Sequence, residues 1–217
     1  MPSSRQARSH TRYQRILDGA LRVFSRRGYR DASVDEIAGA ARTSKGGVYF
    51  HFPSKEAIFL GLLNRTAGRL TEKVEAAGSA HDDPIARADA VLRAVLRTFG
   101  KHRALARLLM VEALGAGREF HRRMAEIRAE FASFIKRHLD TAVAQGVIPP
   151  LDTEVASRAW FGALSEVLTQ AVLSGGSTDL ERTYAALRPL LMRGVGIPEL
   201  AGPGAADTPT RLAASKR

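Results

Sequence analysis

Apolar residues recur along most of this chain at the three- and four-residue spacing of an amphipathic helix. The first stripe runs from Tyr13 to Phe24 and is followed by Gly28, a residue type that commonly ends a helix. Thr11 and Gln14 fit a capping box, in which a hydroxyl and an amide side chain satisfy exposed backbone N–H groups. The pattern therefore predicts a first helix from about Thr11 to Gly28.

Two short helices and the start of a long one follow closely. Ser33 and Glu36 fit a second capping box before a short apolar stripe. Ser44 is the predicted N-cap of another short helix, and Pro53 ends it because the residue before a proline is pushed away from helical angles. Ser54 then caps a long helix. An amphipathic helix followed by two short helices and a tight turn is the layout of a tri-helical helix-turn-helix.

The rest of the chain continues in the helical pattern. Apolar stripes occupy most of residues 85–144, then 152–174 and 179–196, with glycines or prolines between them. Pro189 lies inside the last stripe and is expected to kink or split that helix. No segment shows the two-residue alternation of a strand. The pattern predicts an all-α protein of about nine helices, with an N-terminal helix-turn-helix domain and a C-terminal helical domain.

Changes in composition divide the chain into four parts. Residues 1–10 are polar and basic without periodicity, and we expect them to form a flexible arm. Residues 11–56 hold the predicted helix-turn-helix, and residues 57–197 hold the remaining helices. Residues 198–217 are rich in Ala, Gly, Pro and Thr, a composition that predicts a disordered tail.

Positive charge is concentrated at the N-terminal end. The formal net charge is +11, and the first 60 residues hold eleven Lys and Arg against five Asp and Glu. A basic end favours an acidic partner, nucleic acid first and an anionic membrane second. No apolar run approaches the roughly 18 residues of a membrane span, and there is no secretory signal. The absence of cysteine excludes disulfides and thiolate metal sites.

The segment SKGGVYFHFPSKEA, residues 44–57, points to a particular class of DNA-binding protein. It resembles the recognition-helix signature of the tetracycline-repressor (TetR) family, and ASVDEIA, residues 32–38, is similar to that family's second helix. The resemblance covers about residues 12–63. It implies a sequence-specific transcriptional repressor that binds double-stranded DNA at a palindromic operator and is released by a small-molecule effector.

Two positions depart from the family's usual pattern. The turn before the recognition helix commonly reads Gly-Val, and here it reads Arg42-Thr43. If that position needs a positive φ, Arg42 carries backbone strain that glycine would not carry; alternatively, Arg42 adds a DNA contact. Gly47 stands where many members have threonine, so one hydroxyl contact to the DNA backbone is missing.

The resemblance implies a set of DNA-contacting residues around the second and third helices. They are Ser33, Arg42, Thr43, Ser44, Lys45, Gly46, Gly47, Tyr49, His51 and Lys55. We expect Tyr49 and Lys55 to contact phosphates, and Lys45 to contact a base edge or a phosphate. The alternative for Tyr49 is a core aromatic.

Two further groups near the motif have alternative interpretations. The basic arm, with Arg5, Arg8 and Arg12, either reaches a neighbouring groove or phosphate or remains a solvated tail. Phe50 and Phe52 are expected to pack in the protein, because duplex DNA offers no unstacked bases on which they could stack.

The resemblance also implies a homodimer and a ligand pocket. The helices at residues 152–174 and 179–196 are expected to pair with their symmetry mates, so that two copies read a palindrome; packing within one chain is the alternative. Apolar residues are expected to line the pocket, although core packing explains each of them at least as well: Leu92, Leu96, Phe99, Leu109, Met110, Met124, Ile127, Phe131 and Trp160. Such a lining suits a hydrophobic effector.

Other classes of function fit the sequence less well. No nucleophile elbow, Walker A loop or dinucleotide-binding glycine motif stands in the right context, so we expect no enzyme activity and no cofactor. No His, Asp or Glu pair has metal-ligand spacing, so we expect no metal. The remaining alternatives are a DNA-binding architectural protein or an activator with no small-molecule ligand, and an amphipathic protein at a membrane surface. The expected location is the bacterial cytoplasm, at the nucleoid when the protein is bound to its operator.

Overall fold

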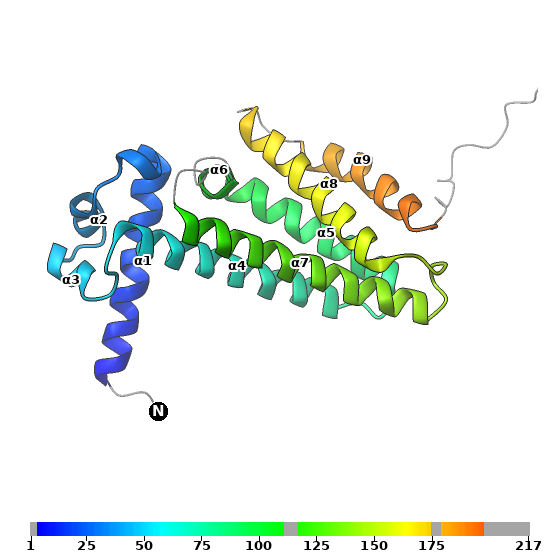
Figure 1. Ribbon diagram of the computed structural model, residues 1–217, viewed down its shortest axis with the longest axis horizontal. Coiled ribbons are helices and arrows are strands. Elements are labelled where there is room, and N and C mark those ends of the chain that lie inside the picture. Colours follow the sequence, from blue (N-terminus) through cyan, green and yellow to red (C-terminus); the bar gives the residue numbers. More distant parts are fainter. Residues whose placement is uncertain (1–3, 111–116, 175–178, 198–217) are drawn as a thin grey trace, which may run out of the picture.

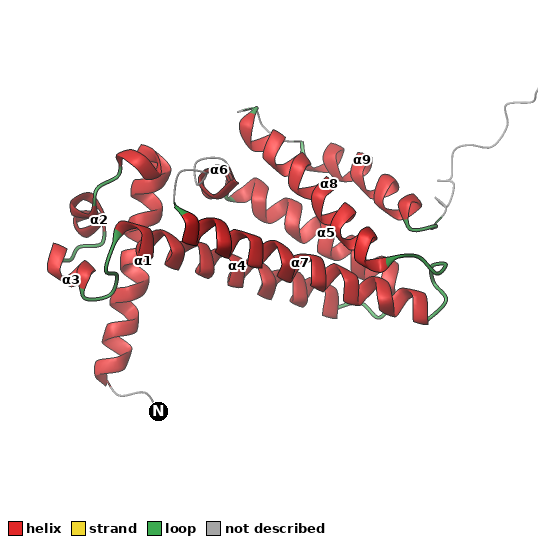
Figure 2. Cartoon of the chain, viewed as in Figure 1, coloured by secondary structure: helices red, strands yellow, loops and turns green. Residues whose placement is uncertain are grey.

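The computed structural model describes residues 4–110, 117–174 and 179–197, and every regular element in these ranges is an α-helix (Figure 2). In chain order the helices are α1 (Ser4–Asp31), α2 (Val34–Ala40), α3 (Lys45–Tyr49), α4 (Lys55–Ser79), α5 (Pro84–Lys101), α6 (Arg103–Met110), α7 (Arg118–Ala144), α8 (Thr153–Leu173) and α9 (Leu180–Gly194). The all-α prediction is confirmed for the described residues. The predicted tail, residues 198–217, lies outside them.

The predicted caps of the short helices form. Ser33 Oγ accepts a hydrogen bond from Glu36 N at 3.2 Å, and the Glu36 carboxylate accepts one from Ser33 N at 3.0 Å. Ser44 Oγ accepts from Gly47 N at 3.0 Å, and Ser54 caps α4 in the same way. These bonds satisfy N–H groups that the first turn of a helix leaves unpaired. They therefore fix where α2, α3 and α4 begin.

The first helix is longer than the sequence predicted. Because α1 begins at Ser4, residues 4–10 are helical where a flexible arm was expected, and Thr11 lies inside the helix instead of capping it. Residues 9–12 are exposed, so this part of α1 has no apolar stripe by which the sequence could reveal it. Gly28 interrupts the helix at φ 78° and ψ 169°, as predicted, and a last turn continues to Asp31.

The last helix passes through Pro189 without being split, so the predicted split is wrong. Residues of α9 near the proline are held by contacts with α5. Arg188 Nε lies 2.8 Å from Asp89 Oδ1, and the Arg93 guanidinium lies 3.6 Å from the ring centroid of Tyr184. Tertiary contacts of this kind offset the hydrogen bond that the proline removes.

Three clusters of buried apolar residues follow one another along the described part of the chain, and the third is a small one around Leu139, Ile148 and Val195. The helices α1, α2 and α3 lie at one end, the long helices α4, α5 and α7 extend away from them, and α8 and α9 cover α5 and α7 (Figure 1). The first core joins α1–α4 and also includes Leu108 of α6 and Phe120 and Ile127 of α7. The second core lies among α4, α5, α7, α8 and α9. The helix-turn-helix therefore shares its core with the helices that follow it.

Candidate nucleic-acid interface

The tight turn between α2 and α3 is held in a strained conformation. Arg42 adopts φ 53°, in the left-handed region that disfavours side chains with a Cβ. Thr43 N donates to Ala38 O at 3.0 Å, and Arg15 Nη2 of α1 donates to the carbonyls of Ala41 at 3.1 Å and Arg42 at 2.9 Å. Strain persists where such surrounding bonds over-determine the backbone. The turn that sets the angle of α3 is thus fixed from α1.

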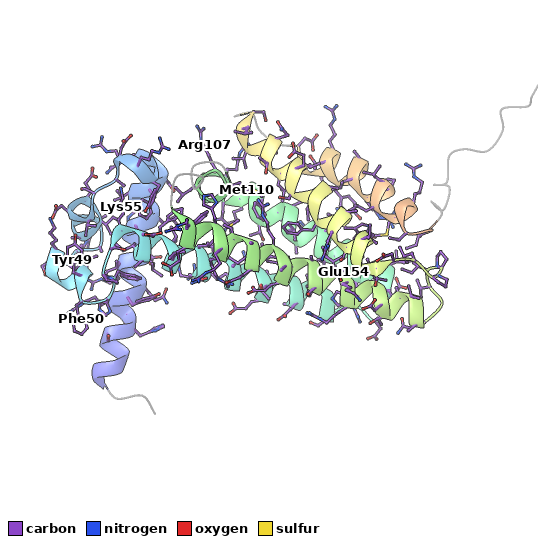
Figure 3. All side chains as sticks on the ribbon, viewed as in Figure 1. Tyr49, Phe50, Lys55, Arg107, Met110 and Glu154 are labelled. Carbon is purple, nitrogen blue, oxygen red and sulfur yellow. The ribbon has the colours of Figure 1, made fainter. Side chains whose placement is uncertain are left out.

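One side chain anchors α3, and its other side chains face outward. Val48 is fully buried, whereas Tyr49 is 45% exposed and Phe50 is 80% exposed. Figure 3 shows both aromatic side chains at the end of the molecule remote from α8 and α9. Tyr49 is therefore not a core aromatic, and the prediction that Phe50 packs in the protein is wrong. Phe52 is buried and stacks on Tyr13 with ring centroids 4.7 Å apart, as expected.

The first turn of α3 has little side-chain bulk. A Cβ on Gly46 would meet open space, but a Cβ on Gly47 would lie 2.5 Å from Thr43 Oγ1. Real Cβ atoms do not approach neighbours so closely, so Thr43 excludes a larger residue at position 47 in its present rotamer. The two departures from the family pattern are therefore linked: the hydroxyl at position 43 occupies the space of a side chain at position 47.

Lys45 lies at the exposed start of α3. Its Nζ is 2.8 Å from Asp35 Oδ2 on α2, and both side chains are more than half exposed. The hydrogen bond to Asp35, followed by the charge of that carboxylate, raises the pKa of Lys45 above its usual value. The ammonium is thus a permanent positive charge at this surface, held by a weak, solvent-screened ion pair.

His51 lies between α3 and the N-terminal part of α1. Burial of the ring, followed by the charge of Arg12, lowers the pKa of His51 below its usual value. The imidazole is therefore neutral at pH 7 and has one N–H to donate. Arg12 is exposed on α1, and the backbone of Arg5 and Arg8 is helical; the side chains of those two residues lie outside the described part of the chain.

Lys55 is used inside the protein. Its ammonium donates to the carbonyls of Tyr29 at 2.9 Å, Arg30 at 2.9 Å and Ala32 at 3.0 Å, and it lies 4.9 Å from the ring centroid of Tyr29. An ammonium has three protons, so none remains for a phosphate. In this structure Lys55 therefore ties the start of α4 to the end of α1, and its expected phosphate contact stays a prediction. Nothing in the sequence pattern predicted these hydrogen bonds of Lys55.

Ser33 is engaged in a similar way. Its backbone N–H and its hydroxyl both donate to Glu36 Oε2, at 3.0 Å and 3.1 Å. These two bonds, the backbone one first, lower the pKa of the Glu36 carboxyl. Both donors of Ser33 therefore serve the cap of α2 in this structure.

A cavity lies among α5, α7, α8 and α9. It is partly open to solvent and is lined by 21 residues, most of them apolar. Leu92 and Trp160 line it, together with residues that the sequence did not single out, such as Ile135. Phe99 lines a different cavity, and Phe131 lines a surface groove between α4 and α7. The helical stripes placed all of these residues inward without separating cavity from core.

The other expected pocket residues pack elsewhere. Leu96 belongs to the second core, and Met110 packs against that core with its Sδ 3.9 Å from Thr169 Oγ1. Met124 and Ile127 pack in the first core, near the helix-turn-helix. The side chain of Leu109 lies outside the described residues.

Charged groups are few around the large cavity. Arg87 and His138 line it near one end, beside Thr141. Burial of the ring, followed by the charges of Arg87 and Arg137, lowers the pKa of His138. The cavity is therefore almost entirely apolar at pH 7, a lining that suits a hydrophobic molecule.

The last two helices present exposed apolar side chains. Val155 is 61% exposed on α8, as are Leu173 of α8 at 52% and Leu190 of α9 at 59%. No helix in the described part of the chain is long and apolar enough to cross a membrane. Within the same residues, no three His, Cys, Asp or Glu side chains gather closely enough to hold a metal ion.

Two family models match the chain. "Bacterial regulatory proteins, tetR family" matches residues 16–62, and "Tetracyclin repressor-like, C-terminal domain" matches residues 81–169. The first match covers the helix-turn-helix, and the second covers α5–α7 and most of α8.

Relatives and solved structures agree with these matches. The chain is 26% identical to the fatty acid metabolism regulator protein of Bacillus subtilis, over 85% of this chain and 95% of that protein. It is 29% identical to the HTH-type transcriptional regulator SrpR of Pseudomonas putida, over 74% of this chain and 75% of that protein. The solved structure of the fatty acid degradation regulator FadR from Bacillus halodurans has a TM-score of 0.77 and 25% identity, and covers 84% of this chain and 98% of that one.

Both curated relatives are named as regulators, and the second is named as an HTH-type transcriptional regulator. The matched helix-turn-helix carries the outward-facing α3, and the matched C-terminal helices carry the apolar cavity. The chain belongs to the tetR family of DNA-binding bacterial regulatory proteins.

Proposed function

We propose that this chain is a homodimeric repressor that binds a palindromic operator through α3 and is released from it by a long-chain acyl effector. The outward face of α3 carries the proposal. That face combines a first turn of small residues with the exposed side chains of Lys45, Tyr49 and Phe50. A short helix with little bulk at its start can enter the major groove and approach the phosphates closely.

The proposed DNA contacts come from the residues around α3 that face outward. They are Arg42, Thr43, Ser44, Lys45, Gly46, Gly47, Tyr49 and His51. Phe50 joins them as an apolar group suited to a thymine methyl. Ser33 and Lys55 support this surface from behind, by capping α2 and by tying α4 to α1. In this scheme residues 11–56 bind DNA and residues 57–197 sense the effector and dimerise.

A dimer is proposed because one short helix buries too little surface for useful specificity; a single DNA-binding module buries roughly 600–1,000 Å². Val155, Leu173 and Leu190 give α8 and α9 an apolar face that a second copy would cover. A two-fold axis there would present two α3 helices to half-sites about one helical turn apart.

The acyl effector is proposed from the cavity and from two relatives. A cavity with an almost entirely apolar lining and few charged groups is suited to a hydrocarbon chain. Two relatives of known name regulate fatty acid metabolism or degradation. The proposed place of action is the bacterial cytoplasm, at the nucleoid in the DNA-bound state.

Fluorescence anisotropy tests the DNA-binding part of the proposal. Labelled duplexes from the intergenic DNA beside the gene are titrated at two salt concentrations, against scrambled duplexes. Binding that prefers one palindrome and keeps that preference as salt rises supports the proposal. Equal and steeply salt-dependent binding to both duplexes would favour an architectural protein that only tracks phosphates.

Sedimentation and operator binding test the dimer, and release of the bound operator tests the effector. Leu190→Glu places a charge on the proposed interface, and sedimentation should then show a monomer with weaker operator binding. Ala125→Glu, on the exposed face of α7, is the matched control and should remain a dimer. Palmitate and palmitoyl-coenzyme A are then added to the bound complex; if neither releases the operator, the acyl effector is wrong.

A further inference from the structure

A second cavity lies where the helix-turn-helix meets the rest of the molecule. It encloses about 700 Å³ of empty space, part of it open to solvent. Its apolar walls are Leu21 of α1, Leu70 of α4, Phe99 of α5 and Ala106 of α6. Figure 1 shows α6 beside the upper part of α1, where these helices meet. A molecule in this junction cavity would therefore touch α1, the helix that fixes the turn before α3.

Cations surround the junction cavity. Arg65, Arg69, Lys73 and His102 line it, and no acidic side chain does. Arg65 is neutralised by Asp18, whose Oδ1 lies 2.7 Å from Arg65 Nη1. Arg69 and Lys73 are exposed and make no ion pair with any residue of the described part of the chain. Within the junction cavity itself these two charges at the rim therefore face no carboxylate, although Arg69 also borders a surface hollow that Asp18 and Glu72 line.

His102 also lies among these positive charges. Burial of the ring, followed by the charges of Lys73, Lys101 and Arg69, lowers the pKa of His102 below its usual value. Like charges in one place disfavour one another, and a bound anion would remove that repulsion. A phosphate group matches such a rim because it has more than one negative charge and several strong acceptor oxygens.

The junction cavity and the large cavity lie along one face of α5. Leu92 and Val95 line the large cavity, and Phe99 lines the junction cavity. Residues three and four apart share a face of a helix, and Val95 and Phe99 are separated by roughly 6 Å along the helix axis. Leu70 and Phe99 pack against the same core as Leu92 and Val95. An apolar chain that displaces side chains of this core would pass from one cavity to the other.

The opposite end of the large cavity is a weaker place for an anion. Arg87 uses both Nε and Nη2 to donate to His81 O, at 3.1 Å and 2.9 Å. The pKa values of His138 and His102 are both lowered, so the histidines do not distinguish the two places. The difference lies in Arg87, which is engaged, and in Arg69 and Lys73, which make no ion pair within the described residues. An acidic head group would therefore gain more at the junction cavity.

We propose that Arg69, Lys73 and His102 bind the phosphate head of an amphiphilic effector, whose apolar chain enters beside Leu70 and Phe99. The inference rests on the proposed function, because it adds a head-group site to the same acyl effector. The head group lies against α4 and α5, and the start of the chain lies against Leu21 of α1. A ligand at this site would thus contact α1, the helix that holds the turn before α3.

Calorimetric titration of the full-length protein tests this site with four probes: palmitoyl-coenzyme A, 1-palmitoyl lysophosphatidate, palmitate and coenzyme A. The wild type should bind the two phosphate-bearing amphiphiles about tenfold or more tightly than palmitate. The double variant Arg69→Ala/Lys73→Ala should lose that preference and leave palmitate unchanged. Arg97→Ala, an exposed arginine of α5 that lines neither cavity, is the control and should bind all probes as the wild type does.

The outcomes separate this inference from the proposed function. Unchanged binding of palmitoyl-coenzyme A and of lysophosphatidate by the double variant would overturn the head-group site, while chain binding would still support the acyl effector. If none of the three probes with a palmitoyl chain binds although operator binding is intact, the proposed acyl effector and its head-group site are both wrong. Tight binding of palmitoyl-coenzyme A alone, or of lysophosphatidate alone, supports the site. It also shows whether the phosphate belongs to an acyl thioester or to a lipid. Lys73→Arg in the single-alanine background Arg69→Ala should preserve binding better than Lys73→Ala.

Discussion

Arg42 is the residue at which strain in the backbone can be measured directly. Its φ of 53° lies in a region that glycine enters without a steric penalty. We predict that Arg42→Gly raises the free energy of unfolding by roughly 0.5–1 kcal/mol, because relief of strain outweighs the extra freedom of glycine in the unfolded chain. Urea denaturation checks this. Arg42→Ala keeps the strain and should show no such gain; equal gains for both variants would mean that the side chain, and not the backbone, was unfavourable.

Thr43 and Gly47 should behave as a coupled pair. Gly47→Ala alone puts a Cβ against Thr43 Oγ1, so it should destabilise the protein despite the better helix propensity of alanine. Once Thr43→Ala has removed the hydroxyl, Gly47→Ala should be neutral or stabilising. We predict a coupling energy of about 1–2 kcal/mol in a double-mutant cycle of unfolding free energies. Additive effects would show that position 43 does not restrict position 47.

At the scale of the elements, two lysines of the helix-turn-helix are expected to differ. Lys55→Met removes three hydrogen bonds between α4 and α1 and should cost about 2 kcal/mol of stability, with the salt dependence of operator binding unchanged. Lys45→Met, its matched control at the exposed end of α3, should leave stability within about 0.5 kcal/mol and lower the salt slope by about 1. Urea denaturation and anisotropy at several salt concentrations measure both. A lower salt slope of operator binding for Lys55→Met would mean that Lys55 contacts a phosphate.

Most of the helices were predictable because they have an apolar stripe, and several of them also have a side-chain N-cap. Ser33, Ser44 and Ser54 cap helices where the sequence indicated. The start of α1 was missed because residues 4–10 have no apolar periodicity. The continuation of α9 through Pro189 was missed because it depends on contacts with α5, which lies far away in the sequence. Local patterns thus predict the helices and the ends that have a side-chain cap, and they miss a helical segment that has neither a stripe nor a cap.

The candidate site was predictable in location and less so in the role of each residue. The segment around α3 stood out by its order and spacing, yet the burial of Phe52 and the exposure of Phe50 follow from the way the chain turns after α3. The use of Lys55 depends on carbonyls at the end of α1. Cavity residues such as Leu92 and core residues such as Leu96 share one helical stripe. Periodicity shows that a side chain points inward. It does not show whether a cavity or another core residue lies beside that side chain.

At the scale of the whole molecule, the first core connects the helix-turn-helix with α7, a helix that also lines the cavity of the proposed effector. Phe59 of α4 contacts Phe24 of α1 and Phe120 of α7, with ring centroids 5.4 Å and 5.1 Å apart. Packed cores shift between discrete arrangements more readily than they deform. A ligand that moves α4, α6 or α7 therefore changes the packing against α1, and with it the position of α3.

Such a connection must act in both directions. If an acyl effector weakens operator binding by some factor, the operator must weaken effector binding by the same factor, commonly 5- to 150-fold. Titration of palmitoyl-coenzyme A with and without operator measures this, and equal affinities in the two titrations would rule out the mechanism. Phe120→Leu, which removes the ring contact with Phe59, should reduce the factor while each separate affinity stays within about twofold. Phe131→Leu, on the same helix and without a ring contact to Phe59 within the described residues, is the control. A reduced factor in Phe120→Leu alone would locate the coupling at the contact between α4 and α7.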